Sequence, residues 1–277
     1  MEVLLLIDPQ VDFCEGGALG VPGGRQALTN VGSFIDCRGE KLDDIVRTFD
    51  QHHRRHIAHP HEYRLCSNGQ IPDPFNALQE ENGEILIGTL DDKGFHPFGK
   101  VRRRLPDDTA WTLRYLKELR TGDRYPHMLW PPHCIIGTPG ACARPEIVQS
   151  VANWEDEYAA VSPAIAKGSG IRSEHFGALR AEVIDPEDES TQTNPYLLAL
   201  LQNPRVTRIY LAGLARGHCL ANTAMDVDKE FGGDEFCQKC VLLTNGTADV
   251  ENMDWLGDKF VDNFVGRGMK TALTTDF

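Results

Sequence analysis

The chain has 277 residues, enough for one large hydrophobic core or for one domain with a sizeable insertion. Its content of 41% hydrophobic and 25% charged residues is typical of a soluble globular protein. The net charge of −13 argues against nucleic acid or an anionic membrane as a partner, and eight cysteines in so long a chain do not indicate a disulfide framework.

An apolar run from Val3 to Ile7 opens the sequence. It lacks the preceding basic segment of a secretion signal and is too short to be one. No stretch approaches the ~18 consecutive apolar residues that a membrane-spanning helix requires. We therefore expect a cytoplasmic protein with no membrane partner, in which most cysteines remain buried thiols.

Short runs rich in Val, Ile and Leu alternate with helical patterns along the chain. The predicted strands are 2–7, 44–49, 159–161, 208–212 and 240–244. The predicted helices are 27–37, 111–120, 145–152, 194–202, 219–231 and 253–264. This alternation predicts a three-layer α/β fold with a doubly wound, mainly parallel sheet flanked by helices. Ligands of such folds bind beyond the carboxyl ends of the strands.

The segment from about 58 to 125 interrupts this alternation, because it is rich in proline and glycine and contains the basic run Lys100–Arg104. We interpret it as an insertion or lid within a single domain of residues 1–277. The basic run is interpreted as a solvated face or an intramolecular ion-pair patch, and contact with an anionic substrate is the alternative.

Asp8, Lys167 and Cys219 each lie at or just beyond a predicted strand end, where an acid, a cation and a thiol can converge. Cys219 also opens a predicted helix, whose dipole should lower the pKa of the thiol and whose amides can hold an oxyanion. Asp8 could take the thiol proton, and Lys167 would keep Asp8 ionised. Each residue alone also has an ordinary structural explanation, but together they indicate a cysteine-nucleophile amidase.

Asp50 and His52 form an Asp-x-His pair after a predicted strand, and His133 could complete a set of one carboxylate and two imidazoles. Such a set suits Zn²⁺, Fe²⁺ or Mn²⁺. His56 is a candidate for a further ligand or a supporting residue. The alternative is that the histidine-rich run 50–56 lies on the surface and binds no metal.

Cys237 and Cys240 could be half of a zinc site or a redox pair, but no second pair accompanies them. We therefore interpret both as packing residues.

Five segments carry a resemblance to a known family. They are IDPQVDFCEGGALGVPGG, DQHHRRH, WPPHCIIGTPGA, AKG and GLARGHCLANTAMD. The chain resembles the nicotinamidase/isochorismatase-like cysteine hydrolases, and WPPHCIIGTPGA is close to the pattern of the nicotinamidase branch. The insertion matches little of a compact nicotinamidase.

The resemblance implies a metal-dependent amidohydrolase that converts a small carboxamide to an acid and ammonia through a thioester on the nucleophile. It implies the following residues. The catalytic residues are Asp8, Lys167 and Cys219, the oxyanion hole is formed by the amides of Ala215 and Cys219, the substrate contacts are Phe13, Trp130 and Leu214, and the metal ligands are Asp50, His52 and His133. It also implies a cis peptide bond between Leu214 and Ala215, a divalent metal with zinc as the first choice, and a homo-oligomer.

Two positions depart from the nicotinamidase pattern: Gly217 replaces an aspartate two residues before the nucleophile, and Gln51 replaces an aromatic residue. A ureido- or maleamate-type amidohydrolase and an isochorismatase-like hydrolase of another substrate therefore remain alternatives. A non-catalytic scaffold protein of the same fold is a third.

Overall fold

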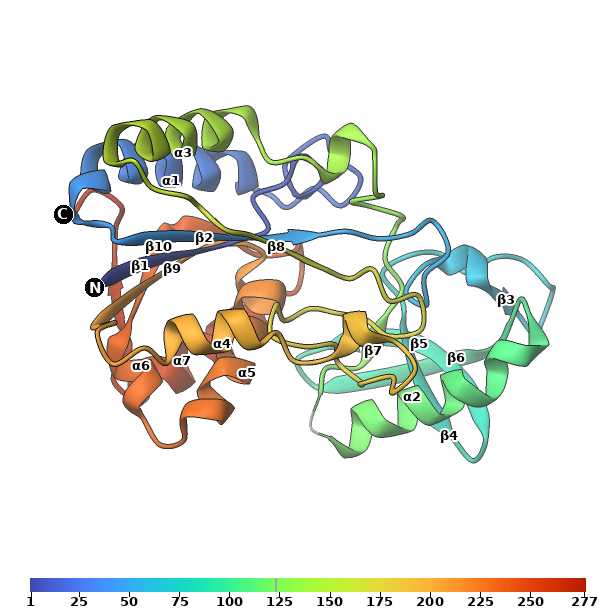
Figure 1. The fold of residues 1–277 in the computed structure, drawn as a ribbon. Helices are drawn as coiled ribbons and strands as arrows, with labels where there is room; N and C mark the ends of the chain where they lie inside the picture. The colour runs from blue at the N-terminus through green and yellow to red at the C-terminus, as the bar shows by residue number, and fades with distance from the viewer. Residues whose placement is uncertain (123) are drawn as a thin grey trace.

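The structure is a computed structural model, and it describes residues 1–122 and 124–277. Its centre is a six-stranded parallel sheet in the order β11-β10-β9-β1-β2-β8 (Figure 1). The strands are β1 (Glu2–Ile7), β2 (Asp44–Asp50), β8 (Ala164–Lys167), β9 (Arg208–Leu214), β10 (Cys240–Ala248) and β11 (Lys270–Ala272).

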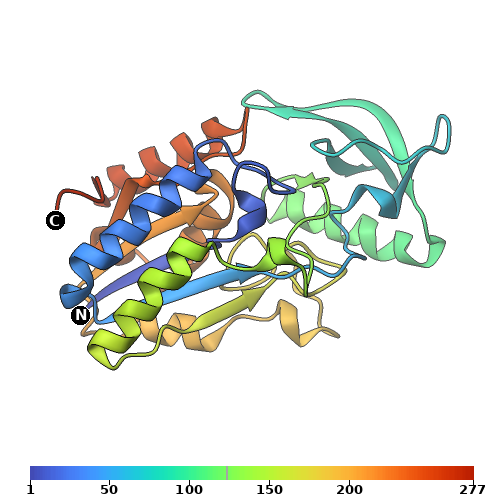
Figure 2. The ribbon, with the colours of Figure 1, turned by 90° about the horizontal axis from the view of Figure 1, so that it is seen from above.

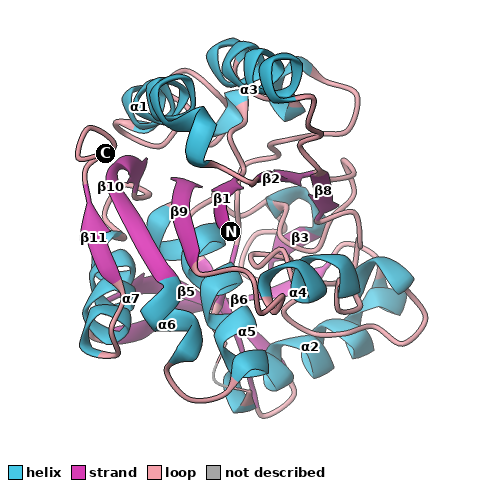
Figure 3. Ribbon diagram, turned by 60° about the vertical axis from the view of Figure 1, so that its left-hand side comes forward, coloured by secondary structure: helices cyan, strands magenta, loops and turns pink. Residues whose placement is uncertain are grey.

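Helices cover both faces of this sheet, as Figures 1 and 3 show. One face carries α1 (Gly24–Arg38) and α3 (Pro145–Tyr158), and the other carries α4 (Pro195–Leu201), α5 (Ala221–Phe231), α6 (Glu235–Lys239) and α7 (Asp254–Gly266). Successive side chains of a strand point to opposite faces. In β1, Leu4 and Leu6 therefore pack into the cluster of α1 and α3, and Leu5 and Ile7 into that of α4, α5 and α7. The predicted three-layer, doubly wound α/β fold is confirmed.

The strand that ends at Lys167 differs from the prediction. The sequence placed a strand at 159–161, but α3 extends to Tyr158 and Ala159 caps it with a left-handed φ of 50°. The strand begins five residues after Ala159, at Ala164, so the prediction was wrong by this offset. The short edge strand β11 was not predicted, since only three residues pair there.

The insertion contains a second sheet, which is five-stranded and antiparallel with the order β3-β6-β5-β4-β7 (Figure 2). Its elements are β3 (Tyr63–Leu65), β4 (Ala77–Glu81), β5 (Glu84–Asp91), β6 (Gly94–Arg103), α2 (Thr109–Thr121) and β7 (His127–Met128). Residues of β3 to β6 form a separate apolar cluster with Tyr115, Leu116 and Leu119 of α2. The sequence predicted this helix but none of these strands.

Contacts of α2 join the insertion to the segment 168–185, which follows β8. The indole Nε1 of Trp111 donates a hydrogen bond of 2.7 Å to the carbonyl of Arg172, and the amide of Glu174 donates to the hydroxyl of Tyr115 at 3.4 Å. The insertion therefore supports a loop that lies beside the carboxyl end of β8.

The basic run of the insertion is an ion-pair patch, as one of the two interpretations expected. Arg103 and Arg104 both pair with the buried carboxylate of Glu62, at 3.3 and 3.2 Å, and Lys100 pairs with Glu84. None of the helices in the described part of the chain combines the length and the apolar character needed to span a bilayer.

Candidate active site

Asp8, Lys167 and Cys219 meet at the carboxyl ends of β1, β8 and β9. The Lys167 Nζ atom lies 3.0 Å from Asp8 Oδ2 and 3.7 Å from Cys219 Sγ. All three side chains are buried. The parallel sheet produces this meeting because the strands end at one edge. The structure thus brings together the three residues that the sequence singled out.

Lys167 is held by four groups. Besides Asp8 and Cys219, its ammonium contacts Asp50 Oδ1 at 3.1 Å and donates to the carbonyl of His175 at 2.9 Å. Burial alone would lower the pKa of Lys167, but the carboxylates of Asp50 and Asp8 raise it well above its usual value. Lys167 is therefore a fixed cation in the site.

The conformation of Gly168 lets the backbone pass close to Asp50 immediately after Lys167. Its φ is +82°, and a Cβ atom there would lie 2.5 Å from Asp50 Oδ1. A glycine meets both demands at this position.

Asp8 is positioned by Thr48, a buried polar residue of β2. The Thr48 hydroxyl donates to Asp8 Oδ1 at 2.6 Å and accepts from the Asp8 amide at 3.1 Å. Burial raises the pKa of Asp8 above its usual value, and the charge of Lys167 acts against this rise. A buried carboxylate with a raised pKa is well suited to accept a proton.

Cys219 lies in a π-helical turn, Arg216–Leu220, that leads from β9 into α5. Burial raises the pKa of the Cys219 thiol well above its usual value, although Lys167 lowers it. The sequence led us to expect a lowered pKa for this thiol, whereas its burial in the folded site raises it. The thiol keeps its proton until a base removes it, and Asp8 is in place for that task.

The residue two positions before Cys219 is a glycine because α7 packs directly against it. A Cβ atom on Gly217 would lie 2.6 Å from the amide nitrogen of Gly257. A carboxylate is still present at this point of the site: Asp249 accepts a hydrogen bond of 3.0 Å from the Gly217 amide and pairs with Arg216.

Asp50, His52 and His133 form a buried group whose possible ligand atoms all lie within 4.8 Å of one another. Asp50 Oδ2 is 2.8 Å from His52 Nε2 and 3.4 Å from His133 Nε2. The other ring nitrogens bond to backbone carbonyls: His52 Nδ1 lies 2.9 Å from the carbonyl of Gly168, and His133 Nδ1 lies 2.9 Å from that of Pro131. Such carbonyl bonds orient an imidazole so that Nε2 is free to bind a metal.

Further imidazoles surround this group. His56 is buried, its ring centre lies 4.3 Å from that of His52, and its Nε2 has no hydrogen-bond partner among the described residues. His59 Nε2 is buried and unpartnered in the same way. Burial lowers the pKa of His56 well below its usual value and that of His59 to about 3, so both rings are neutral, as metal ligands must be. The residues present fit a divalent metal ion, with His56 near enough to contribute.

A small cavity opens above Cys219. Its lining is mostly apolar and aromatic, namely Phe13, Leu19, Trp130, Phe176, Ala215, His218 and Val250, together with Asp50, His133, Glu174 and Cys219. Of the predicted substrate contacts, Phe13 and Trp130 line the cavity, whereas Leu214 is packed in the hydrophobic core. The peptide bond between Leu214 and Ala215 is cis, as the resemblance implied.

Several residues of the site were not singled out from the sequence. Thr48 carried no distinctive signal, because its strand, DIVRTFD, also contains Arg47 and two aspartates. Glu174, His175 and Phe176 lie in an irregular segment, so no helix or strand pattern in the sequence could predict where their side chains lie. Cys237 and Cys240 lie away from the site as free, buried thiols, which agrees with a packing role.

The fold and the site together define an α/β protein with a buried acid–lysine–thiol cluster beside a carboxylate–imidazole group that fits a metal. No protein-family model matches the chain. A nicotinamidase of Acinetobacter baylyi is 24% identical over 226 residues, which cover 82% of this chain and 74% of that protein.

Solved structures show the same fold. A nicotinamidase of Acinetobacter baumanii superimposes with a TM-score of 0.62 at 19% identity, covering 99% of this chain and 97% of that one. A pyrazinamidase of Pyrococcus horikoshii in complex with zinc gives a TM-score of 0.53 at 20% identity, covering 98% of each chain. The chain is thus similar to nicotinamidases over most of its length and shares their fold, which supports the family resemblance that its motifs predicted.

Proposed function

We propose that the protein is a metal-dependent cysteine amidohydrolase that converts a small aromatic carboxamide, with nicotinamide as the first candidate, to the acid and ammonia. One observation carries the proposal. The Lys167 ammonium joins the Asp8 carboxyl at 3.0 Å and the Cys219 thiol at 3.7 Å, next to a small cavity with a mostly apolar and aromatic lining.

In the proposed reaction, Cys219 Sγ attacks the carboxamide carbon while Asp8 takes the thiol proton. The amides of Ala215 and Cys219 stabilise the oxyanion of the tetrahedral intermediate. The C–N bond then breaks, Asp8 gives its proton to the departing ammonia, and a thioester remains on Cys219. Water, deprotonated by Asp8, cleaves the thioester and releases the acid with the thiol restored.

Asp50, His52 and His133 would hold the metal, with His56 as a possible further ligand. A divalent ion there would supply a Lewis-acid centre that orients the substrate. We propose zinc, because a solved relative was obtained in complex with that metal and because two imidazoles and a carboxylate suit it.

The lining of the cavity favours an uncharged aromatic amide over a substrate that carries its own carboxylate, such as maleamate or a ureido acid. No lysine or arginine is among the described residues that line the cavity. Arg216, which could have reached a carboxylate, is held by Asp249 and Asp258. Phe13, Trp130 and Phe176 instead offer aromatic surfaces.

The test is ammonia release from nicotinamide, pyrazinamide, maleamate and ureido acids, combined with intact-mass detection of an acyl-enzyme. Wild type should release ammonia from an aromatic amide, and Cys219→Ala should not. Cys142→Ala, which removes an exposed thiol, is the matched control and should retain activity. Substantial turnover by Cys219→Ala would refute covalent catalysis, and release from maleamate alone would refute the substrate class.

We also propose that the insertion and the parallel sheet form one domain, that the protein works in the cytoplasm, and that it assembles as a homo-oligomer. Two hydrogen bonds between α2 and the segment 168–185, one from Trp111 and one to Tyr115, support the first point. The other two rest on the sequence, and light scattering of the purified chain tests the oligomer.

A further inference from the structure

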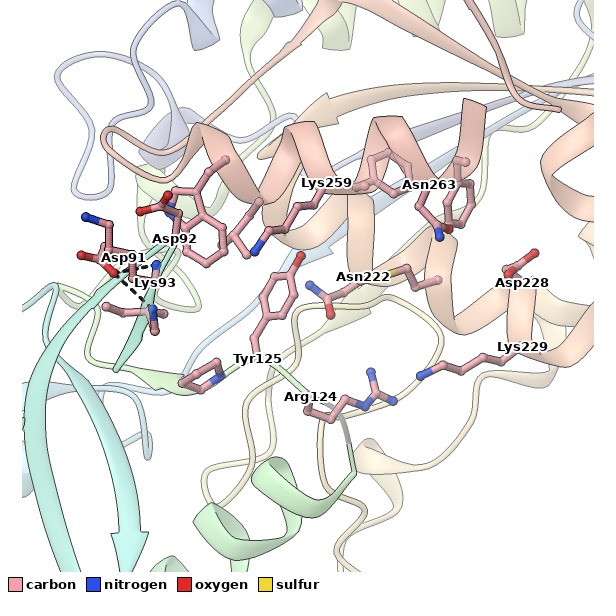
Figure 4. Close-up of a pocket in the computed structure, with 18 of the residues that line it drawn as sticks. Asp91, Asp92, Lys93, Arg124, Tyr125, Asn222, Asp228, Lys229, Lys259 and Asn263 are labelled. Carbon is pink, nitrogen blue, oxygen red and sulfur yellow. Dashed lines mark hydrogen bonds between the residues drawn. The ribbon is translucent and has the colours of Figure 1, made fainter. Parts of the chain in front are cut away.

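A second, larger cavity lies between the insertion and the helices α5 and α7 (Figure 4). Its volume is about 580 Å³, within the range of roughly 300–1,000 Å³ that accommodates drug-sized ligands. None of Asp8, Lys167 and Cys219 lines it. The cavity is therefore separate from the proposed catalytic cavity.

The cationic side chains that line this cavity include paired and unpaired members. Arg124 and Arg267 line it but are neutralised by carboxylates: Arg124 pairs with Glu182 and Asp226, and Arg267 with Asp228 and Asp234.

By contrast, Lys93, Lys229 and Lys259 form no ion pair with any residue that the structure describes. Of the lining acids, Asp228 pairs with Arg267, and Asp91 pairs only with His96, which is charged only if protonated. Among the described residues, five cationic and three acidic side chains thus line the cavity, on a chain whose net charge is −13. The local charge favours an anionic ligand.

Aromatic side chains stand beside these lysines. The Lys259 Nζ atom lies 4.5 Å from the centre of the Trp255 ring, and Figure 4 shows Tyr125 extending into the cavity toward Lys259. Tyr125 and Trp255 are both half-buried, so each presents ring surface to an occupant. A ligand with an aromatic ring can stack on such surfaces while its anionic group contacts the ammonium groups.

We propose that this cavity binds a small anion that carries an aromatic ring, of the chemical class of a mononucleotide. A single-ring acid would fill only a small part of 580 Å³, whereas a base, a sugar and a phosphate together match a cavity of drug-ligand size. The ring lies against Tyr125 or Trp255, and the phosphate lies either at Lys259, beside these rings, or at Lys229 on α5.

Residues that line the two cavities are in contact with one another. The Tyr125 ring centre is 6.0 Å from that of His218, and Asn222 donates a hydrogen bond of 2.9 Å to the His218 carbonyl. His218 lines the catalytic cavity. An experiment must therefore distinguish a ligand in the second cavity from one that enters the catalytic cavity.

The test is calorimetric titration of the full chain with AMP, with adenosine and with inorganic phosphate. We expect AMP to bind, and both adenosine and phosphate to bind at least about tenfold more weakly because each lacks one half of the recognised chemistry. The double variant Lys229→Gln/Lys259→Gln should weaken AMP binding about tenfold or more. The control Lys41→Gln/Lys270→Gln, which neutralises two exposed lysines elsewhere, should leave it unchanged.

Three results would overturn the proposal. The first is an absence of AMP binding at concentrations of about 1 mM, a weak-binding limit for a specific small ligand. The second is phosphate binding as tightly as AMP. The third is AMP binding that survives Lys229→Gln/Lys259→Gln but disappears in Phe13→Leu, which would place the ligand at the catalytic cavity. Unchanged thermal unfolding midpoints in the lysine variants would show that a loss of binding is local.

Discussion

Replacing Lys167 with methionine should destabilise the protein strongly. The change keeps the apolar part of the side chain but removes an ammonium that is 3% exposed and lies 3.0 Å from Asp8 and 3.1 Å from Asp50. Removing one partner of a buried ion pair leaves an uncompensated buried charge, which costs about 3–5 kcal/mol. We expect a loss of that size in the free energy of unfolding at pH 8.

The loss should depend on pH in a defined direction. Burial already raises the pKa of Asp8, and removal of Lys167 raises it further. A carboxyl group whose pKa is raised by folding favours the folded state while it is protonated, and this contribution is lost as the pH rises through the folded pKa. The variant should therefore be closer to wild type at pH 5 than at pH 8.

Urea unfolding in the presence of a chelator measures this, because metal content then does not differ between the proteins. The matched control is Lys239→Met, which removes an i,i+4 pair of 2.7 Å with the exposed Glu235 and should cost only about 0.3–0.5 kcal/mol. If Lys167→Met were as mild as this control, or if its deficit did not grow with pH, the account of Lys167 as the charge that compensates two buried carboxylates would be refuted.

Three further predictions follow from other parts of the molecule. Burial raises the pKa of Glu182 to about 7 from the usual 4.5. As the pH rises from 5.5 to 8, Glu182→Gln should therefore become more stable relative to wild type, by at most about 3 kcal/mol in the free energy of unfolding. A stability difference that stays constant across this pH range would contradict the raised pKa. His133→Ala should lose bound metal in elemental analysis while the exposed His53→Ala keeps it, and equal metal content in both would argue against His133 as a ligand. Gly217→Ala should lower the free energy of unfolding by about 1–3 kcal/mol through its contact with Gly257, and a neutral effect would show that α7 can move away.

The parallel sheet and the cluster of Asp8, Lys167 and Cys219 were predictable from the sequence because both depend on local patterns. Apolar runs identified β1, β2, β9 and β10, and the polar residues at strand ends identified Asp8 and Cys219. Lys167 was singled out even though its strand was misplaced. The strand was misplaced because α3 ends at Ala159, a left-handed residue where a glycine would have marked the end of the helix.

The second sheet was not predictable in the same way. Strand β4, ALQEE, is too polar for an apolar run, and β6 contains Pro97, a residue that usually argues against a strand. The register of β5 against β6 shifts between Ile87 and Gly88, so the alternation of buried and exposed residues is broken near Pro97. Side chains from irregular segments, such as Phe176, reach the cavity through tertiary contacts that no local pattern encodes.

The hydrogen bonds between α2 and the segment 168–185 should affect how these two parts of the sequence evolve. That segment supplies the His175 carbonyl to Lys167 and the Phe176 ring to the catalytic cavity, while Trp111 and Tyr115 of the insertion hold it from the outside. A substitution in the insertion can thus alter the position of Lys167, the proposed catalytic lysine, without touching it. We expect the two segments to co-vary among homologues that carry the insertion, and the segment to diverge freely in those that lack it.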